Sequence, residues 1–313
     1  MRKITNKKKK CIFPAKNHRG DITTEQIVLI IILIVSFAVI LFFLFRLNLG
    51  KTTEQQNCHN SVVTRGSGVV PKESIPLNCK TQYACLTKDG TCKTMPNAQI
   101  QKVKTATDVY QFLAEQMADC WWMFGEGKLN YLGEDFGAHL YCSICSQVSF
   151  DKSVQNIEEF KNGEIDENQF YNYLSATKLP GKDTSYLDYM IGVKSSGAIT
   201  EALASNSKNF GKIYLNKDYY VMTGMFNEVG VLTWIAGGVA VGTGIALAAI
   251  TGGASIPATV AILGGIGVGG TAGYFVGTTV KGASGHDYLS PTIVEATPTL
   301  LNDLKCEQIK SLA

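Results

Sequence analysis

The cysteines are the residues of this chain whose type and spacing most directly suggest chemistry. Cys142-Ser-Ile-Cys145 is a C-x-x-C motif, which forms a redox pair when it opens a helix in a thioredoxin-like setting. Here it precedes the strand-like Gln147 to Phe150, and no second closely spaced pair completes a zinc site. We therefore interpret both cysteines as members of structural disulfides, with redox and metal sites as minor alternatives.

Titratable residues gather between positions 126 and 139, where Glu126, Glu134, Asp135 and His139 lie. Asp135 and His139 are four residues apart and could share a helix face. Acid–base catalysis needs such groups to converge in a cleft, which spacing does not establish. We interpret the cluster as a solvated loop and expect no catalytic residue, metal or cofactor. An envelope enzyme or thiol-redox protein that uses this region is our third functional hypothesis.

The most informative stretch of the chain is an apolar run near the N-terminus. Residues 27–45 are uncharged, and eight of the first nineteen residues are basic while none is acidic. Nineteen helical residues match the roughly 30 Å hydrocarbon core of a bilayer. The basic excess holds the N-terminus in the cytoplasm and sends the rest of the chain outside, with membrane lipids as partners. Residues 51–227 carry 17 Lys/Arg and 19 Asp/Glu, a net charge of −2, which excludes nucleic acid as a partner.

The start of the apolar run has a recognisable sequence, Lys16-Asn-His-Arg19-Gly20-Asp21-Ile-Thr-Thr-Glu25. It resembles the archaeal class III signal peptide of type IV pilin-like proteins. The resemblance implies cleavage after Gly20 by a prepilin-type peptidase, Asp21 as the first mature residue, and Glu25 as the acid at the fifth position. It also implies self-association through the retained helix. Asp21 departs from the Gln usual there, and an uncleaved signal anchor is the alternative.

The predicted topology divides the cysteines between the cytoplasmic tail and the exported region. Cys11 lies in the basic tail, and eight cysteines follow the apolar run. An even number in an exported region predicts up to four disulfides, with 105 possible connectivities. These eight are Cys58, Cys79, Cys85, Cys92, Cys120, Cys142, Cys145 and Cys306.

A second uncharged run covers Val229 to Val280. It divides near Ser255 into two apolar segments, each long enough to span a bilayer as a helix. Glycines four residues apart predict close helix packing. They are Gly238, Gly242, Gly265, Gly269, Gly273 and Gly277. Two further spans would place Ser255 in the cytoplasm and return Cys306 to the outside. A glycine-rich hairpin buried in a soluble domain is the alternative.

The fold class that we predict is a membrane-anchored α+β protein. Thr105 and Asp108 predict a capped helix that Gly125 and Gly127 end. The expected segments are 1–20, a basic cytoplasmic tail or leader; 21–47, a transmembrane helix; 48–104, a Cys-rich loop and strand stalk; 105–227, an α+β ectodomain; 228–281, a glycine-zipper helical hairpin; and 282–313, an extracytoplasmic tail.

The leading functional hypothesis is a non-enzymatic cell-surface or envelope protein, pilin-like in its processing, with a structural or interaction role. The alternative is an oligomeric pore or membrane-remodelling protein that acts through the glycine-rich hairpin.

Overall fold

The computed structural model describes residues 24–46, 49–69, 71–93, 95–133, 136–137, 139–191, 212–227, 247–250, 258–266, 272–281, 285–304 and 306–309. The chain divides into two compact units, Met1–Lys51 and Thr52–Ala313. Each unit is described by itself.

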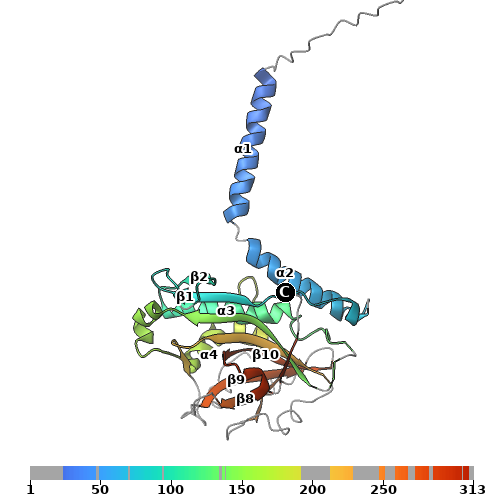
Figure 1. Cartoon of the computed structure of the whole chain (residues 1–313), viewed down its shortest axis with the longest axis vertical. Helices are drawn as coiled ribbons and strands as arrows, with labels where there is room; N and C mark the ends of the chain where they lie inside the picture. The colour runs from blue at the N-terminus through green and yellow to red at the C-terminus, as the bar shows by residue number, and fades with distance from the viewer. Residues whose placement is uncertain are drawn as a thin grey trace, which may run out of the picture. The chain divides into compact units, whose positions relative to one another are not determined.

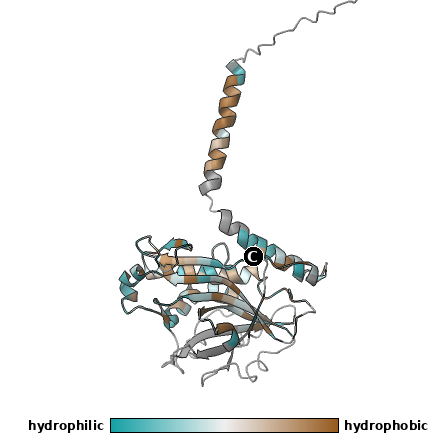
Figure 2. Ribbon diagram, in the orientation of Figure 1, coloured by the Kyte–Doolittle hydropathy of each residue, from teal (hydrophilic) through white to brown (hydrophobic). Residues whose placement is uncertain are grey.

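The first unit contains helix α1, Thr24–Arg46 (Figure 1). From Thr24 to Phe42 its mean hydropathy is 2.8 and none of it is buried, and Figure 2 shows apolar residues along its length. Leu33 is 63% exposed and Phe37 is 62% exposed, which is unfavourable in water. Within the described residues, α1 is the one helix long and apolar enough to cross a membrane. It fits a signal-peptide-like or anchoring segment.

A mixed β-sheet forms the centre of the second unit (Figure 1). In the described residues, eight of its nine strands follow the order β2-β1-β3-β6-β10-β9-β8-β7, and β11 pairs with β3 beside this path. The strands are β1 Gln82–Thr87, β2 Gln99–Lys102, β3 Leu140–Phe150, β6 Tyr219–Phe226, β7 Leu247–Ile250, β8 Ala258–Ile266, β9 Ala272–Lys281, β10 Asp287–Glu295 and β11 Cys306–Gln308. Strands β4 Glu164–Asp166 and β5 Lys212–Tyr214 form a separate antiparallel pair.

Strand β3 organises the sheet because three strands pair with it. Strand β6 runs antiparallel along one edge, and β1 and β11 are both parallel to β3. Since β6 occupies one edge, β1 and β11 share the other. Antiparallel pairing continues from β6 through β10 and β9 to β8 and β7.

Most helices of the domain contribute to one large core cluster with the strands of this sheet. Helix α3, Ala106–Met123, contributes Leu113, Met117 and Trp121 to the larger core cluster. The other helical segments of the domain are η1 Lys72–Ser74, η2 Lys152–Asn156, η3 Glu158–Phe160, α4 Glu167–Ala176 and α5 Tyr186–Ile191. A smaller core cluster contains Leu300 of the short helix α8, Leu300–Asp303, and Leu304, which follows this helix. Cys306 belongs to the same cluster. The α+β class expected for the domain is thus observed.

The two ends of α3 lie where the sequence predicts them. Thr105 accepts a hydrogen bond from the Asp108 amide, and Asp108 accepts one from the Thr105 amide, which completes a capping box. Gly125 and Gly127, with φ values of 78° and 68°, follow the helix in the left-handed region that glycine tolerates.

The segment expected as a loop-rich stalk begins differently. Helix α2, Leu49–Gly66, occupies its first third. Cys58 and Val62 lie four residues apart on α2 and are 1% and 0% exposed in the core cluster of the domain. So short an apolar stripe in a polar sequence gives little periodic signal, and tertiary packing stabilises this helix. Residues from Thr52 onward belong to the same unit as the rest of the domain.

The glycine-rich run also differs from the expected helical hairpin where it is described. Residues 258–266 and 272–281 form the antiparallel strands β8 and β9, with Gly265 paired to Gly273 and Ala261 paired to Gly277. Glycine costs about 1 kcal/mol relative to alanine in a helix, and the many Thr, Val and Ile residues favour strands. Gly238, Gly242 and Gly269 lie outside the described residues.

Candidate functional site

The eight cysteines that follow α1 are all paired, as the sequence indicates. The disulfides are Cys58–Cys79, Cys85–Cys92, Cys120–Cys145 and Cys142–Cys306. They join α2 to the segment before β1, β1 to its following loop, α3 to β3, and β3 to β11. Four disulfides and an apolar N-terminal helix are consistent with a membrane-anchored or secreted protein whose domain is in an oxidising compartment.

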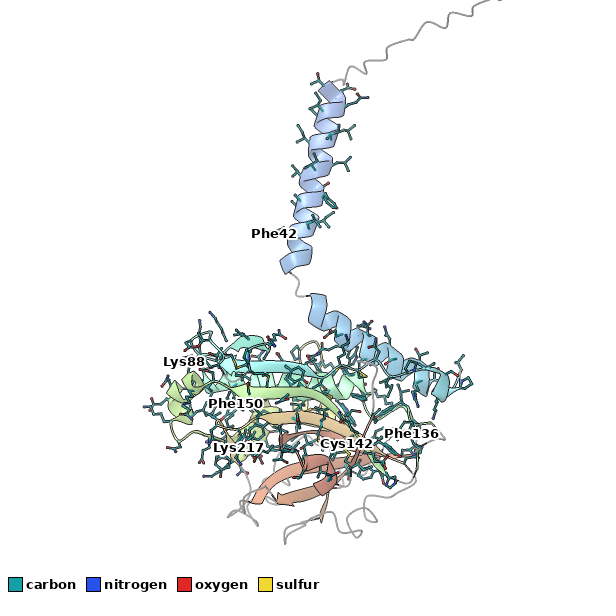
Figure 3. All side chains as sticks on the ribbon, viewed as in Figure 1. Phe42, Lys88, Phe136, Cys142, Phe150 and Lys217 are labelled. Carbon is teal, nitrogen blue, oxygen red and sulfur yellow. A yellow bond between two sulfur atoms is a disulfide. The ribbon has the colours of Figure 1, made fainter. Side chains whose placement is uncertain are left out.

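The C-x-x-C motif lies inside β3 rather than at a helix start (Figure 3). Cys142 belongs to the smaller core cluster and Cys145 to the larger one, so the two sulfur atoms serve opposite faces of the sheet. Each bonds to a different partner, and the motif does not form the dithiol pair that a redox site requires. Among the described residues, no group of three or more His, Cys, Asp or Glu side chains could hold a metal ion.

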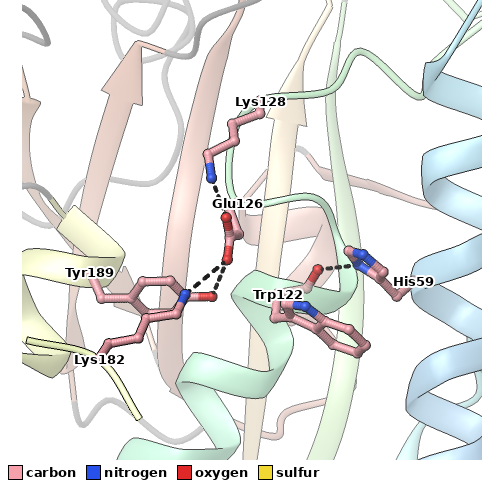
Figure 4. A network of polar contacts seen from close by, with 6 residues as sticks. All are labelled: His59, Trp122, Glu126, Lys128, Lys182 and Tyr189. Atoms are coloured by element: carbon pink, nitrogen blue, oxygen red, sulfur yellow. Dashed lines mark hydrogen bonds and ion pairs between the residues drawn. The ribbon is translucent and has the colours of Figure 1, made fainter. Parts of the chain in front are cut away.

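Glu126 anchors a polar network at the end of α3 (Figure 4). Its carboxylate accepts hydrogen bonds from Lys128, from Lys182 at 3.3 Å and from the Tyr189 hydroxyl at 2.6 Å. Burial raises the pKa of Glu126, but the hydrogen bonds and the two lysine charges outweigh it and lower the pKa to about 2. Such a stably ionised carboxylate holds a loop and is a poor general base near neutral pH.

The same close-up shows how α2 meets α3. The ring of His59 stacks on Trp122, with centroids 4.0 Å apart, and His59 Nδ1 lies 2.7 Å from the Trp122 carbonyl oxygen. This contact belongs to the packing between the helices.

The other members of the expected titratable cluster do not join Glu126. His139 lies 3.4 Å from Glu307, and both side chains are more than half exposed. Glu134 and Asp135 lie outside the described residues. In the described part of the chain, Glu126 and His139 belong to separate sets of contacts.

A different acid, Glu167, is buried in the core. Glu167 is the first residue of α4, Glu167–Ala176, and is 6% exposed. Its Oε2 atom has no hydrogen-bond partner among the described residues. Burial, with a smaller effect from the charge of Asp166, raises the pKa of Glu167 to about 8. It borders a cavity of about 10 Å³ with Met117 and Ile293, which is space for about one water. The carboxyl group is therefore mostly protonated at neutral pH.

The processing residues can be placed only in part. Gly20 and Asp21 lie outside the described residues, and Glu25 stands in the first turn of α1.

An interrupted edge of β3 forms the best candidate binding site. Strand β11 pairs with Leu140–Cys142 and β1 pairs with Ser146–Phe150. Residues 143–145 lie between them and pair with neither strand. Beyond β11, the Ile309 amide donates to the carbonyl oxygen of Cys142 at 2.9 Å. Before β1, the Thr81 hydroxyl donates a hydrogen bond to the carbonyl oxygen of Ile144 at 3.1 Å.

A pocket of about 340 Å³ opens at this interruption. Its volume lies at the lower end of the range for small-molecule sites. The described residues that line it are Leu77, Cys79, Thr81, Phe124, Ser143, Ile144, Gln308 and Ile309. None carries a charge.

Ser143 lies on the buried side of this lining. It is 5% exposed, and its Oγ atom is covered by the surrounding residues. Burial raises the pKa of the Tyr131 hydroxyl, and a side-chain hydrogen bond with Ser143 opposes that rise. The two buried hydroxyls therefore lie close together.

Sequence reasoning missed this pocket. One signal was available, because Ser143 stands between Tyr141 and Cys145, two residues that a strand turns to the same buried face. The gap between β1 and β11 depends on long-range pairing and leaves no local pattern.

Comparison with protein-family models, with curated proteins and with solved structures gives no match to this chain.

Proposed function

We propose that this protein is a non-enzymatic, membrane-anchored cell-surface or envelope protein with a structural or interaction role. The observation that carries the proposal is an exposed, apolar α1 followed in the chain by a domain whose eight cysteines are all paired. An apolar helix of this length suits a bilayer, and disulfides persist in oxidising compartments. The lysine-rich tail then faces the cytoplasm.

The structural role is supported by the way the disulfides are placed. Each joins two different segments of the domain, and one closes a span of 164 residues from Cys142 to Cys306. Crosslinks of this kind constrain the unfolded chain and stabilise the fold by about 2–4 kcal/mol each. A domain braced in this way suits prolonged exposure outside the cell.

Pilin-like processing is the finer part of the proposal. A prepilin-type peptidase would cut after Gly20, leave Asp21 as the new N-terminus and keep Glu25 beside the membrane, where self-association through α1 follows. Gly20→Leu should block that cut, and mass spectrometry of the native N-terminus measures it. An intact lysine tail on the mature protein would instead indicate a plain signal anchor.

Thiol labelling in intact cells tests the topology of the proposal. An uncleaved chain should react at Cys11 with a membrane-permeant maleimide and nowhere with an impermeant one. After reduction and unfolding on the cell surface, the impermeant reagent should label the eight domain cysteines. Cys11→Ser is the matched control and should remove the first signal alone. Free domain thiols, or recovery of the chain from the soluble cytosol, would contradict the proposal.

A further inference from the structure

We infer that the outer edge of β2 binds an extended acidic segment of another protein, which adds a strand to the sheet. This surface is separate from the pocket beside β3. The inference extends the interaction role proposed above, but it rests on the domain alone and stands whether or not α1 crosses a membrane. The thiol labelling described above and the titration described below can therefore fail independently of each other.

Strand β2 is the last strand at its end of the described sheet, where it pairs with β1 (Figure 1). Beyond β2, the Val103 amide donates to the Thr87 carbonyl oxygen at 2.9 Å. Because the backbone groups of alternate residues point to opposite edges of a strand, Gln101 also turns its groups towards β1. Ile100 and Lys102 turn their amide and carbonyl groups the other way, to the outer edge.

Two backbone positions of β2 are thus left for an incoming strand. Among the described residues, no group forms a hydrogen bond with the amide or the carbonyl oxygen of Ile100. The Lys102 carbonyl oxygen has a long contact of 3.5 Å with Gln101 Nε2. Unpaired edges of this kind are templates for a further strand, and main-chain hydrogen bonds supply the affinity when a peptide is added.

An apolar pair lies beside this edge, on the face of the sheet opposite the larger core cluster. Cys85 and Ile100 are register partners, so Tyr83, two residues before Cys85, shares the face of Ile100. The intervening β1 residues Ala84 and Leu86 belong to the larger core cluster on the other face. Tyr83 and Ile100 are each about half exposed. They offer a contact for one apolar side chain of the incoming strand, opposite Ile100.

Lysine is concentrated in the segment that contains this edge. Residues 80–104 carry five lysines and one acid, a net charge of +4, whereas residues 51–227 as a whole carry −2. The one acid, Asp89, already accepts hydrogen bonds within its own turn. In the part of the chain that the structure describes, Lys93 and Lys102 form no ion pair. The edge is therefore a positive surface on a domain of the opposite net charge.

This charge determines which strand can be added. A second copy of β2 would place Lys102 beside another positive segment, and like charges on neighbouring strands are destabilising. Lysine on an edge strand is a common protection against such self-pairing. A carboxylate opposite Lys102 is attracted instead. The favoured ligand therefore has an apolar residue opposite Ile100 and an acid two residues away, on the same face.

A symmetric peptide, acetyl-Glu-Thr-Val-Thr-Glu-amide, tests the site because it presents this pattern in both strand directions. It is titrated by saturation-transfer NMR against the full-length protein in zwitterionic lipid nanodiscs, and empty nanodiscs supply the background. A second probe has lysine in place of both glutamates. A third has N-methyl groups on its three central amides, which removes the donors that strand pairing needs. We expect saturable binding of the acidic probe and at least about tenfold weaker binding of the other two.

Three outcomes of the titration would overturn the inference. The first is absence of saturable binding by the acidic probe, and the second is equal binding of the acidic and lysine probes. The third is equal binding of the acidic probe and its N-methylated form, which would show that charge alone holds the ligand, without strand addition. None of these comparisons alters the fold of the protein.

Variants of β2 locate the binding. Ile100→Pro removes an outward amide without breaking a bond to β1 and should weaken binding of the acidic probe about two- to tenfold. Ile100→Val keeps that amide and should bind within about twofold of the wild type. Lys102→Glu should weaken the acidic probe about three- to tenfold and strengthen the lysine probe. Lys178→Glu makes the same charge change between α4 and α5 and is the control. Equal affinities for the acidic probe in Lys102→Glu and Lys178→Glu, or in Ile100→Pro and Ile100→Val, would refute the assignment to β2.

Discussion

Two glutamates show how individual residues acquire opposite properties from their surroundings. Glu126 is surrounded by Lys128, Lys182 and Tyr189, which hold its pKa near 2. Glu167 has an apolar environment, and burial raises its pKa to about 8. Desolvation acts on both, and only Glu126 has cationic partners to overcome it. The first side chain is an ion that fixes a loop, and the second is mostly a neutral acid within the core.

The raised pKa of Glu167 predicts a pH dependence of stability. The folded state holds the proton up to about pH 8, whereas the unfolded chain releases it near the ordinary value of 4.5. The stabilising effect is therefore complete below about pH 4.5 and is lost as the pH rises through 8. Glu167→Gln mimics the protonated acid and should stabilise the protein at pH 8–9, by an order of 1 kcal/mol or more.

Thermal unfolding of both proteins between pH 4 and pH 9 provides the measurement. Glu159→Gln is the control, because Glu159 is exposed and should not change the slope with pH. Parallel wild-type and Glu167→Gln profiles across this range would show that Glu167 titrates normally in the folded protein.

Among the elements, the glycine-rich strands show that a spacing of four residues does not distinguish a helix from a strand. Residues four apart lie on nearly the same side of a helix and also on the same side of a strand. The stripe through Gly265, Gly273 and Gly277 is therefore compatible with both structures. Pairing with β10, which joins β9 at Asp287–Leu289, favours the strand because it extends an existing sheet.

A cysteine pair distinguishes the two structures. Ala261 and Gly277 are register partners on β8 and β9, so Ala261→Cys with Gly277→Cys should form a disulfide within one chain. Shifting the second cysteine to Thr278 turns it to the opposite face and should prevent the bond. Non-reducing peptide mapping measures both. Equal crosslinking of the two pairs, or crosslinking only between chains, would favour helices and the pore hypothesis.

For the whole molecule, continuity of the sheet distinguishes a single membrane span at α1 from the three-span topology. Strands β7, β8 and β9 join the same sheet as β3, whose Cys145 and Cys142 form disulfides with Cys120 and Cys306. A sheet cannot continue through a bilayer into a second compartment while its strands remain paired. Everything after α1 should therefore lie on one side of the membrane.

Epitope tags test this topology directly. Tags inserted at Gly68 and Ser255 should both be accessible from outside intact cells, and a tag before Arg2 should be accessible only after permeabilisation. The three-span arrangement predicts a cytoplasmic Ser255 tag instead. Finding that tag inside would restore the helical hairpin.

Features that depend on composition and on local order could be predicted from the amino-acid sequence. Nineteen uncharged residues after a basic tail indicate α1, Thr105 and Asp108 start α3, and eight cysteines beyond the apolar run indicate an oxidised domain. Each of these signals lies within a few turns of chain or in a simple count, so no knowledge of distant contacts is needed.

Features that depend on partners far along the chain required the three-dimensional structure. The even cysteine count permits 105 pairings, and packing of β3 against α3 and β11 selects the partners of Cys145 and Cys142. Helix α2 forms because Cys58 and Val62 are buried against the domain. The pocket beside Ser143 exists because β1 and β11 pair with one edge of β3 and leave three residues between them, an arrangement set by long-range pairing rather than by local sequence.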